Sequence, residues 1–312
     1  MNQASTVHQL SQQLRAHASQ AQIDQALHKP VIILSAPRSG STLLFEYLTQ
    51  LQGTSCIGGE SHRVFRNFPH LRAENKALDS ASLNEAHADP RCIELFRDNM
   101  GSLLRDISQQ SFAQNPALFL QQPKRLIEKT PRNALNIPFL NKVFPDAKFI
   151  FLHRAPQQNI ASIIEAWTLG LRTGRFMTFP GLPGWDRPGW CFLLPPGWRD
   201  LVGRSLAEIA AFQWRMSNQT IIQNLAKLPA EKYCKVSHEN LLANPESEID
   251  RLLDFAEIAS QGINHLQFAD KLSNTTLTEP ATDKWKTQKA EIEPLLPSLE
   301  ATRRAIEQFD AQ

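Results

Sequence analysis

Short apolar runs alternate along this chain with longer segments of helical periodicity. The runs are rich in β-branched and aromatic residues, which suit strands buried on both faces of a parallel sheet. They occupy 31–34, 54–57, 125–128, 148–153 and 232–236. Between them, apolar residues recur at helical spacing after 41, after 156 and over 205–227. The pattern therefore predicts an α/β fold with a central parallel sheet flanked by helices.

The first apolar run leads into a polar turn that is followed by the start of a helix. A strand, turn and helix N-terminus form an anion site, because the first N–H groups of a helix lack an internal partner and the macrodipole adds partial positive charge. Glycine lets the backbone come close to a phosphate, while hydroxyls and a guanidinium add donors. The residues predicted to bind the phosphate are Arg38, Ser39, Gly40, Ser41 and Thr42.

This turn departs from the P-loop pattern G-x-x-x-x-G-K-[ST] of nucleoside triphosphatases. Gly40 and Thr42 fit the pattern, but Ser35 replaces the first glycine and Ser41 replaces the lysine. The cationic residue of this turn is instead Arg38, which precedes Gly40. Because a nucleoside triphosphatase would be handicapped without that lysine, a different phosphate compound is favoured. An ordinary strand-turn-helix with a few small polar residues is the alternative interpretation.

Two further runs end in polar residues that could reach the same ligand, because ligands bind at the carboxyl ends of parallel strands. Glu60 and His62 follow the run 54–57, and Lys129 follows the run 125–128. A carboxylate in this place can act as a general base, and histidine competes for that role because it titrates near neutral pH. Solvated surface residues are the alternative interpretation for all three side chains.

The run 148–153 points to a second phosphate position. It ends in Arg154, and Ser162 lies in the helix predicted after Pro156, so both side chains could face one anion. A Walker B strand would end in an aspartate that binds Mg²⁺, whereas this run ends in His153-Arg154. The ending favours an anion over a metal, and no metal site is predicted.

Composition narrows the class of partner and the compartment. The net charge of +2 argues against a general nucleic-acid or membrane-surface binder. The four cysteines include no C-x-x-C pair and indicate free thiols in a reducing compartment. Neither an apolar leader nor a run of about 20 apolar residues that could span a bilayer is found. A cytoplasmic location is therefore expected, without a membrane span and without a nucleic-acid partner.

Together these motifs resemble those of the sulfotransferases that use 3′-phosphoadenosine-5′-phosphosulfate (PAPS) as donor. The turn 37–42 resembles the family's 5′-phosphosulfate loop, and Arg154 and Ser162 match the residues that hold the 3′-phosphate. Lys284 and Trp285 resemble a late loop that closes over the nucleotide. Further similar segments are 128–131 and 236–242. The resemblance covers nearly the whole chain from about residue 30.

This resemblance implies a P-loop-like three-layer fold and the transfer of a sulfuryl group from PAPS to a hydroxyl or amine. The product would be adenosine 3′,5′-bisphosphate, and the acceptor a small molecule or a peptide. Glu60 resembles the base of the protein-tyrosine sulfotransferases, with His62 as its competitor. Arg38 and Lys129 would stabilise charge on the transferring group, and Ser273 would assist. The scheme requires no metal.

The domain organisation follows from the same resemblance. Residues 1–29 are expected to form an N-terminal helical extension, and 30–312 a single domain. Within it, residues 167–200 hold four of the six tryptophans and five prolines. Irregular stretches of this length are often binding loops, so this insert is predicted to wall the acceptor pocket. A structural flap packed on the core is the alternative.

Departures from the family leave the acceptor undefined. The Lys-x-His motif of cytosolic small-molecule members is not found, and Glu60-Ser61-His62-Arg63 stands where the tyrosine enzymes have Glu-Thr-Arg. Neither the Golgi membrane anchor of those enzymes nor the Gly-x-x-Gly-Asp-Trp-Lys form of the late loop is present. Two other classes stay open: a P-loop kinase-like phosphotransferase, which would need Mg²⁺, and a non-catalytic nucleotide-binding module.

Overall fold

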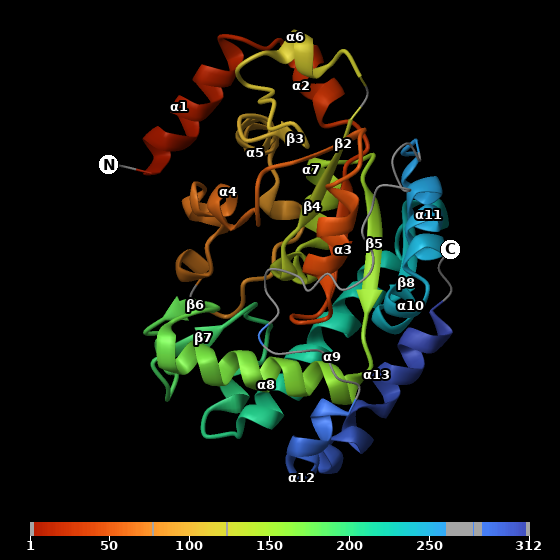
Figure 1. The fold of residues 1–312 in the computed structure, drawn as a ribbon. Helices are drawn as coiled ribbons and strands as arrows, with labels where there is room; N and C mark the ends of the chain where they lie inside the picture. Colours follow the sequence, from red (N-terminus) through yellow and green to blue (C-terminus); the bar gives the residue numbers. More distant parts are fainter. Residues whose placement is uncertain (1–2, 77, 123, 260–276, 278–282, 310–312) are drawn as a thin grey trace.

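The computed structural model describes residues 3–76, 78–122, 124–259, 277 and 283–309 of the chain. At its centre lies a six-stranded sheet within these residues (Figure 1). All neighbouring strands are parallel except β2 and β3, which are antiparallel. In spatial order the strands are β3 (Arg105–Asp106), β2 (Thr54–Cys56), β4 (Arg125–Lys129), β1 (Val31–Leu34), β5 (Lys148–His153) and β8 (Tyr233–Ser237).

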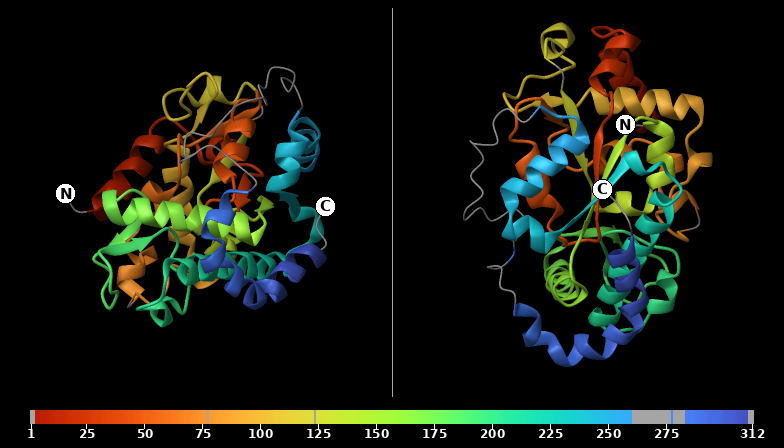
Figure 2. Two further views of the ribbon diagram at one scale, coloured as in Figure 1. Left: turned by 60° about the horizontal axis from the view of Figure 1, so that its bottom comes forward. Right: turned by 90° about the vertical axis from the view of Figure 1, so that its right-hand side faces the viewer.

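Helices cover both faces of this sheet, as the predicted three-layer fold requires. The side chains of β1 alternate between two separate cores: Val31 and Ile33 belong to one, and Ile32 and Leu34 to the other. The right-hand view of Figure 2 shows helices on either side of the sheet. The first core is closed by α3 (Ser41–Leu48), α10 (His238–Ala243) and α11 (Pro245–Ala256).

The second core is larger, because most of the remaining helices pack on it. Two long helices, α8 (Pro156–Thr173) and α9 (Leu206–Leu225), lie against each other there. A serine caps α9: the side chain of Ser205 accepts a hydrogen bond from the backbone N–H of Glu208. The other α-helices are α1 (Gln3–Arg15), α2 (Gln20–Ala26), α4 (His62–Arg66), α5 (Pro90–Gly101), α6 (Pro116–Phe119), α7 (Ile137–Val143), α12 (Lys289–Ile292) and α13 (Leu296–Gln308).

Short 3₁₀ turns join these elements. They are η1 (Pro69–Leu71), η2 (Ala73–Lys76), η3 (Glu85–His87), η4 (Pro131–Leu135), η5 (Trp198–Leu201), η6 (Ala230–Lys232), η8 (Lys284–Gln288) and η9 (Glu293–Leu295). In Figure 1 the arrow of β5 points toward α8, and β1, β2 and β4 run parallel to β5, so α8 crosses the carboxyl edge of the sheet. Residues that follow β1, β2, β4 and β5 are therefore gathered at the edge that α8 crosses.

The insert 167–200 is more regular than its sequence predicts. α8 continues through its beginning, and β6 (Met177–Pro180) pairs antiparallel with β7 (Gly189–Cys191). Trp190 is fully buried, and its ring centroid lies 4.8 Å from that of Trp185 and 5.2 Å from that of Trp167. These tryptophans hold the insert to the core, as the structural alternative requires.

Candidate active site

The turn between β1 and α3 has the backbone of an anion-binding loop. Arg38, with φ of 63°, and Gly40, with φ of 93°, both lie in the left-handed region, and Gly40 caps α3. Turns of this kind point successive backbone N–H groups into a concavity that suits an anion. A Cβ atom on Gly40 would lie 2.4 Å from Cδ2 of His238, so a side chain does not fit there.

A buried asparagine fixes the shape of this turn. The hydroxyl of Ser39 donates to Oδ1 of Asn159 at 2.8 Å, and Nδ2 of Asn159 donates to the carbonyl oxygen of Pro37 at 2.8 Å. Asn159 is fully buried in the first turns of α8. The hydroxyl proton of Ser39 is therefore already used in a hydrogen bond to Asn159. The two hydrogen bonds of Asn159 connect α8 to the turn.

Arg154 lies directly beside the turn, at the end of β5. Its Nη1 donates to the carbonyl oxygen of Arg38 at 3.2 Å, and its own carbonyl oxygen accepts from the indole of Trp214 at 3.2 Å. Burial lowers the pKa of Arg154, against the opposing charge of Glu239. Its Nε is buried without a hydrogen-bond partner among the described residues. A desolvated cation with an unsatisfied donor is suited to bind an anion.

Ser162 follows Asn159 by three positions on α8, and Glu165 follows Ser162 by three, so each lies about 60° around the helix from the one before it. Glu165 forms an ion pair with Lys284 of η8, with Oε2 and Nζ 2.7 Å apart. Trp285 is partly buried against the larger core. The two late residues predicted to contact the nucleotide thus pack along the helix that carries Ser162.

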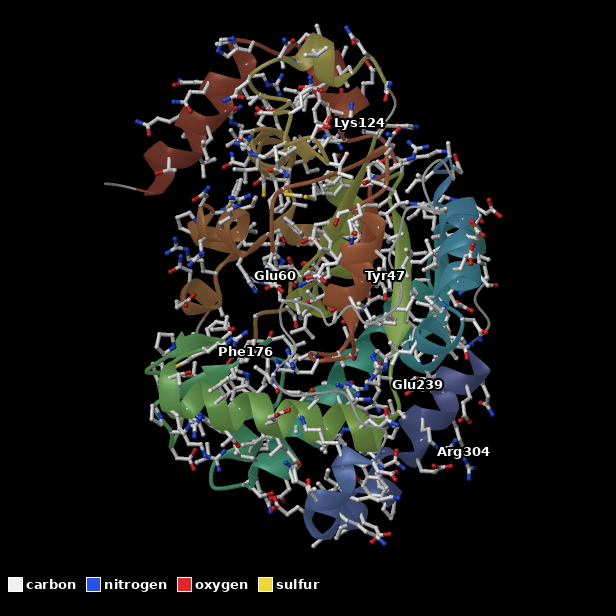
Figure 3. All side chains as sticks on the ribbon, viewed as in Figure 1. Tyr47, Glu60, Lys124, Phe176, Glu239 and Arg304 are labelled. Atoms are coloured by element: carbon white, nitrogen blue, oxygen red, sulfur yellow. The ribbon has the colours of Figure 1, made fainter. Side chains whose placement is uncertain are left out.

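A second cluster joins the ends of β2 and β4. Nζ of Lys129 donates to Oε1 of Glu60 at 2.6 Å, and Nε2 of His62 lies 3.1 Å from Oε2 of the same carboxylate. Lys129 also lies over the ring of Phe45 in α3, 5.9 Å from its centroid. The structure therefore brings Glu60, His62 and Lys129 together next to the helix that follows the turn. Figure 3 labels Glu60 and, on that helix, Tyr47.

The surroundings of Glu60 favour its charged form. Burial alone would raise the pKa of this carboxyl group. The hydrogen bond from His62, and the charge and hydrogen bond of Lys129, outweigh burial and lower the pKa to about 2. Glu60 is thus ionised at neutral pH and able to accept further hydrogen bonds.

A buried network positions the loop that carries Glu60. The hydroxyl of Thr130 accepts from the backbone N–H of Ser61 at 2.8 Å and donates to Oε1 of Glu128 at 2.6 Å. Glu128 also accepts a hydrogen bond from Asn133, and burial raises its pKa. Thr130 therefore joins the loop after β2, which carries Glu60, to the loop after β4.

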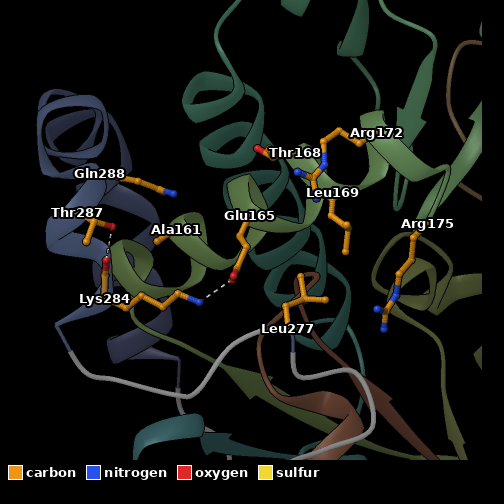
Figure 4. Close-up of a pocket in the computed structure, with 10 residues that line it drawn as sticks. All are labelled: Ala161, Glu165, Thr168, Leu169, Arg172, Arg175, Leu277, Lys284, Thr287 and Gln288. Carbon is orange, nitrogen blue, oxygen red and sulfur yellow. Dashed lines mark hydrogen bonds and ion pairs between the residues drawn. The ribbon is translucent and has the colours of Figure 1, made fainter.

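A pocket of about 500 Å³ lies along α8 (Figure 4). Its walls include residues of the helix and of η8, together with Arg175 and Leu277. Arg175 lies over the ring of Phe176 at 4.9 Å from the centroid, and Arg38 lies over the same ring at 5.4 Å. The pocket thus adjoins the turn between β1 and α3.

Sequence reasoning missed several residues that the structure places at this site: Asn159, Glu165, Arg175, Phe176 and His238. Only Asn159 carried a usable signal, because it precedes Ser162 by three positions in the same predicted helix. Ser273, predicted to assist the reaction, lies outside the described residues. Within the described part of the chain, no helix is long and apolar enough to cross a membrane. No metal-binding group of three or more His, Cys, Asp or Glu side chains occurs there either.

Comparison with known proteins extends this description. Residues 30–179, slightly less than half of the chain, match the sequence model of the Sulfotransferase family. The predicted resemblance to sulfotransferases is confirmed. A curated relative, protein-tyrosine sulfotransferase A of Caenorhabditis elegans, is 22% identical over 255 residues, which are 81% of this chain and 57% of the relative. The chain thus spans just over half the length of this sulfotransferase.

A solved sulfotransferase structure shares the fold. Sulfotransferase STF9 from Mycobacterium avium aligns with a TM-score of 0.50 and 17% identity, over 97% of this chain and 82% of that protein. The sulfotransferase domain of the Synechococcus PCC 7002 olefin synthase aligns with a TM-score of 0.47 and 19% identity, over 88% of this chain and 95% of the domain. The similarity to STF9 confirms the sulfotransferase fold with its central, mostly parallel sheet.

Proposed function

We propose that this protein is a sulfotransferase that moves a sulfuryl group from PAPS to a hydroxyl or amine acceptor. The observation that supports this proposal best is the meeting of two clusters at one edge of the sheet. The turn with Arg38 and Arg154 suits a ligand with more than one phosphate, and Glu60 with Lys129 suits proton removal beside a fixed cation. The acceptor would be a small molecule or a peptide.

The residues of the turn and of α8 fit such a donor. Arg38, Gly40, Ser41 and Thr42 would hold its 5′-phosphosulfate, and Arg154 and Ser162 its 3′-phosphate. The unpartnered buried Nε of Arg154 supports this assignment, because a buried donor without a partner costs about 1–3 kcal/mol. Lys284 and Trp285 would lie over the nucleotide, and Lys284 would then exchange part of its ion pair with Glu165 for the ligand.

The donor, when bound, supplies a sulfuryl group whose S–O bond to the 5′-phosphate breaks as a bond to the acceptor oxygen or nitrogen forms. Glu60 would accept the acceptor's proton. Its pKa of about 2 makes it a weak base while Lys129 is paired with it. Lys129 and Arg38 would stabilise the negative charge that gathers on the transferring group and the leaving phosphate. His62, 3.1 Å from the same carboxylate, is the competing base.

Transfer of radiolabelled sulfate from PAPS to phenols, sugars, lipids and peptides tests this function. Glu60→Gln should bind adenosine 3′,5′-bisphosphate as the wild type does, and should lower turnover by roughly 10²–10⁴-fold, the usual contribution of a general base. The paired variant is His62→Ala. If Glu60→Gln keeps normal turnover while His62→Ala loses it, the base is His62. Absence of transfer to every acceptor, together with normal nucleotide binding, would favour a non-catalytic binding module.

Three further assignments extend the proposal and rest on the sequence. Ser273 would assist the transfer, the insert 167–200 would face the acceptor, and the protein would act in the cytoplasm. The insert does supply part of the pocket along α8, namely Thr168, Leu169, Arg172 and Arg175. A kinase-like phosphotransferase is the competing class. It predicts activity with ATP that stops when EDTA removes Mg²⁺.

A further inference from the structure

The charges around the pocket along α8 do not balance. Arg172, Arg175 and Lys284 line it, and Glu165 is the carboxylate among the lining side chains. Glu165 is already paired with Lys284 at 2.7 Å. In the described part of the chain, no carboxylate forms an ion pair with Arg172 or Arg175. The two guanidinium groups are exposed, and they leave one part of the pocket positively charged.

This positive region is connected to the place where the sulfuryl group would be transferred. Arg175 and Arg38 lie over the same ring, that of Phe176, at 4.9 and 5.4 Å from its centroid. Burial lowers the pKa of Arg38 to about 10, with Glu165 opposing this shift and Arg175 adding to it. Two residues that line the pocket therefore act directly on the cation of the phosphate-binding turn.

The shape and lining of the pocket suit a small molecule. Its volume is about 500 Å³, and Leu169 and Leu277 contribute apolar walls. From Ala161 to Arg172 the helix rises by about 16 Å, at 1.5 Å per residue. Figure 4 shows Lys284 and Arg175 at opposite ends in this view, with Glu165 and Leu277 between them. A ligand with an apolar body and one charged end would suit the part of this space near Leu169, Leu277 and Arg175.

We infer that the acceptor is a small molecule that carries an anionic group, such as a carboxylate, bound by Arg172 and Arg175. Its hydroxyl or amine then lies near Arg38, and its apolar body lies against Leu169 and Leu277. Phe176 positions Arg175 and Arg38 relative to each other, and it does so with a φ of 67°, which is strained for a phenylalanine. This inference rests on the proposed function, because the bound molecule is taken to be the acceptor.

Two matched pairs of probes test the inference. The pairs are 3-(4-hydroxyphenyl)propanoate with its amide, and 6-hydroxyhexanoate with its amide. Binding is measured by calorimetry in the presence of saturating adenosine 3′,5′-bisphosphate, and transfer is measured with labelled PAPS. At least one carboxylate should bind about tenfold more tightly than its amide, as expected for a charge-assisted hydrogen bond. The double variant Arg172→Gln/Arg175→Gln should remove this preference, whereas Arg91→Gln, at an exposed position of α5 outside the pocket lining, should keep it.

The outcomes separate this inference from the proposed function. Equal binding of carboxylates and amides, or no binding of any probe, would overturn the inference while nucleotide binding and the function stood. If the double variant instead weakened binding of adenosine 3′,5′-bisphosphate more than tenfold, the arginines would serve the donor's 3′-phosphate and the inference would again fail. If the wild type did not bind that nucleotide, the proposed function and the inference would fall together.

Discussion

His62 and Lys129 favour the charged form of Glu60. This effect should be measurable in the pH dependence of the free energy of unfolding. The pKa of this group is about 2 in the folded protein and 4.5 in its ordinary state. A lowered pKa stabilises the fold above the ordinary value, and this stabilisation is lost as the pH falls toward 2. Glu60→Gln should therefore be less stable than the wild type at pH 7 and at pH 5, with a difference that shrinks from pH 4 to pH 3.

Urea unfolding at these four pH values measures the difference. Glu94→Gln is a suitable control, because Glu94 lies in an exposed ion pair with Arg91 and such pairs contribute little. A difference between wild type and Glu60→Gln that is as large at pH 3 as at pH 7 would contradict the pairing of Glu60 with Lys129 and His62.

Gly40 offers a second test at the scale of a single residue. Its left-handed backbone would be strained with a side chain, and an added Cβ atom would lie 2.4 Å from Cδ2 of His238. Gly40→Ala should weaken the binding of adenosine 3′,5′-bisphosphate more than tenfold, because the turn must change shape. Gly203→Ala is the matched control: its φ is 76°, with no atom within 4 Å of the added Cβ. Both variants should lose some stability, but only Gly40→Ala should lose nucleotide affinity, and equal affinities would contradict this role of the turn.

At the scale of elements, the strand ends are joined by side chains rather than by the sheet alone. Thr130 connects the loop after β2 to that after β4 through its hydroxyl. Thr130→Val keeps the shape of the side chain but leaves Ser61 N–H and Glu128 without this partner, at a cost of about 1–3 kcal/mol. We expect Thr130→Val to lower turnover at least tenfold with little change in nucleotide affinity, since it displaces Glu60 and not the turn.

The conservative variant Thr130→Ser separates positioning from simple destabilisation, because it retains the hydroxyl and removes only the methyl group. Turnover should recover in Thr130→Ser, while nucleotide affinity stays as in the wild type. If Thr130→Val and Thr130→Ser lost turnover equally, the hydroxyl network would not position Glu60.

The sequence predicted the long and strongly patterned elements, and missed those that depend on distant contacts. The strands β1, β4 and β5 and the helices α8 and α9 lie where periodicity places them. The helical extension predicted over 1–29 holds two helices in its described part, because α1 ends at Arg15 and Ser19 caps α2. β3 has two residues and β7 three, so their existence depends on a partner strand and leaves no period to detect.

For the whole molecule, topology is what made the grouping of these side chains at one edge predictable. Parallel strands place their carboxyl ends at one edge, so Arg38, Glu60, Lys129 and Arg154 could be grouped from the sequence alone. Contacts between segments far apart in the chain could not be predicted in this way. Glu165 with Lys284, and Arg38 with Phe176, join segments more than 100 residues apart. The contribution of these charges and rings to the site can be inferred only from the structure, in which α8 crosses the carboxyl edge of the sheet.

The central claim is that this edge binds a nucleotide through separate 5′- and 3′-phosphate positions without Mg²⁺. Calorimetric titration of the wild type and Arg154→Ala with adenosine 3′,5′-bisphosphate, 5′-AMP and ATP, each in EDTA and in Mg²⁺, tests it most directly. The wild type should bind the bisphosphate most tightly in both conditions. Arg154→Ala should lose about one to two decades of that affinity, as expected for a charge-assisted hydrogen bond of about 1.5–3 kcal/mol, and little affinity for 5′-AMP. Equal losses of affinity for the bisphosphate and 5′-AMP in Arg154→Ala would show that Arg154 supports the turn without holding a 3′-phosphate. Tighter binding of ATP that requires Mg²⁺ would contradict the claim.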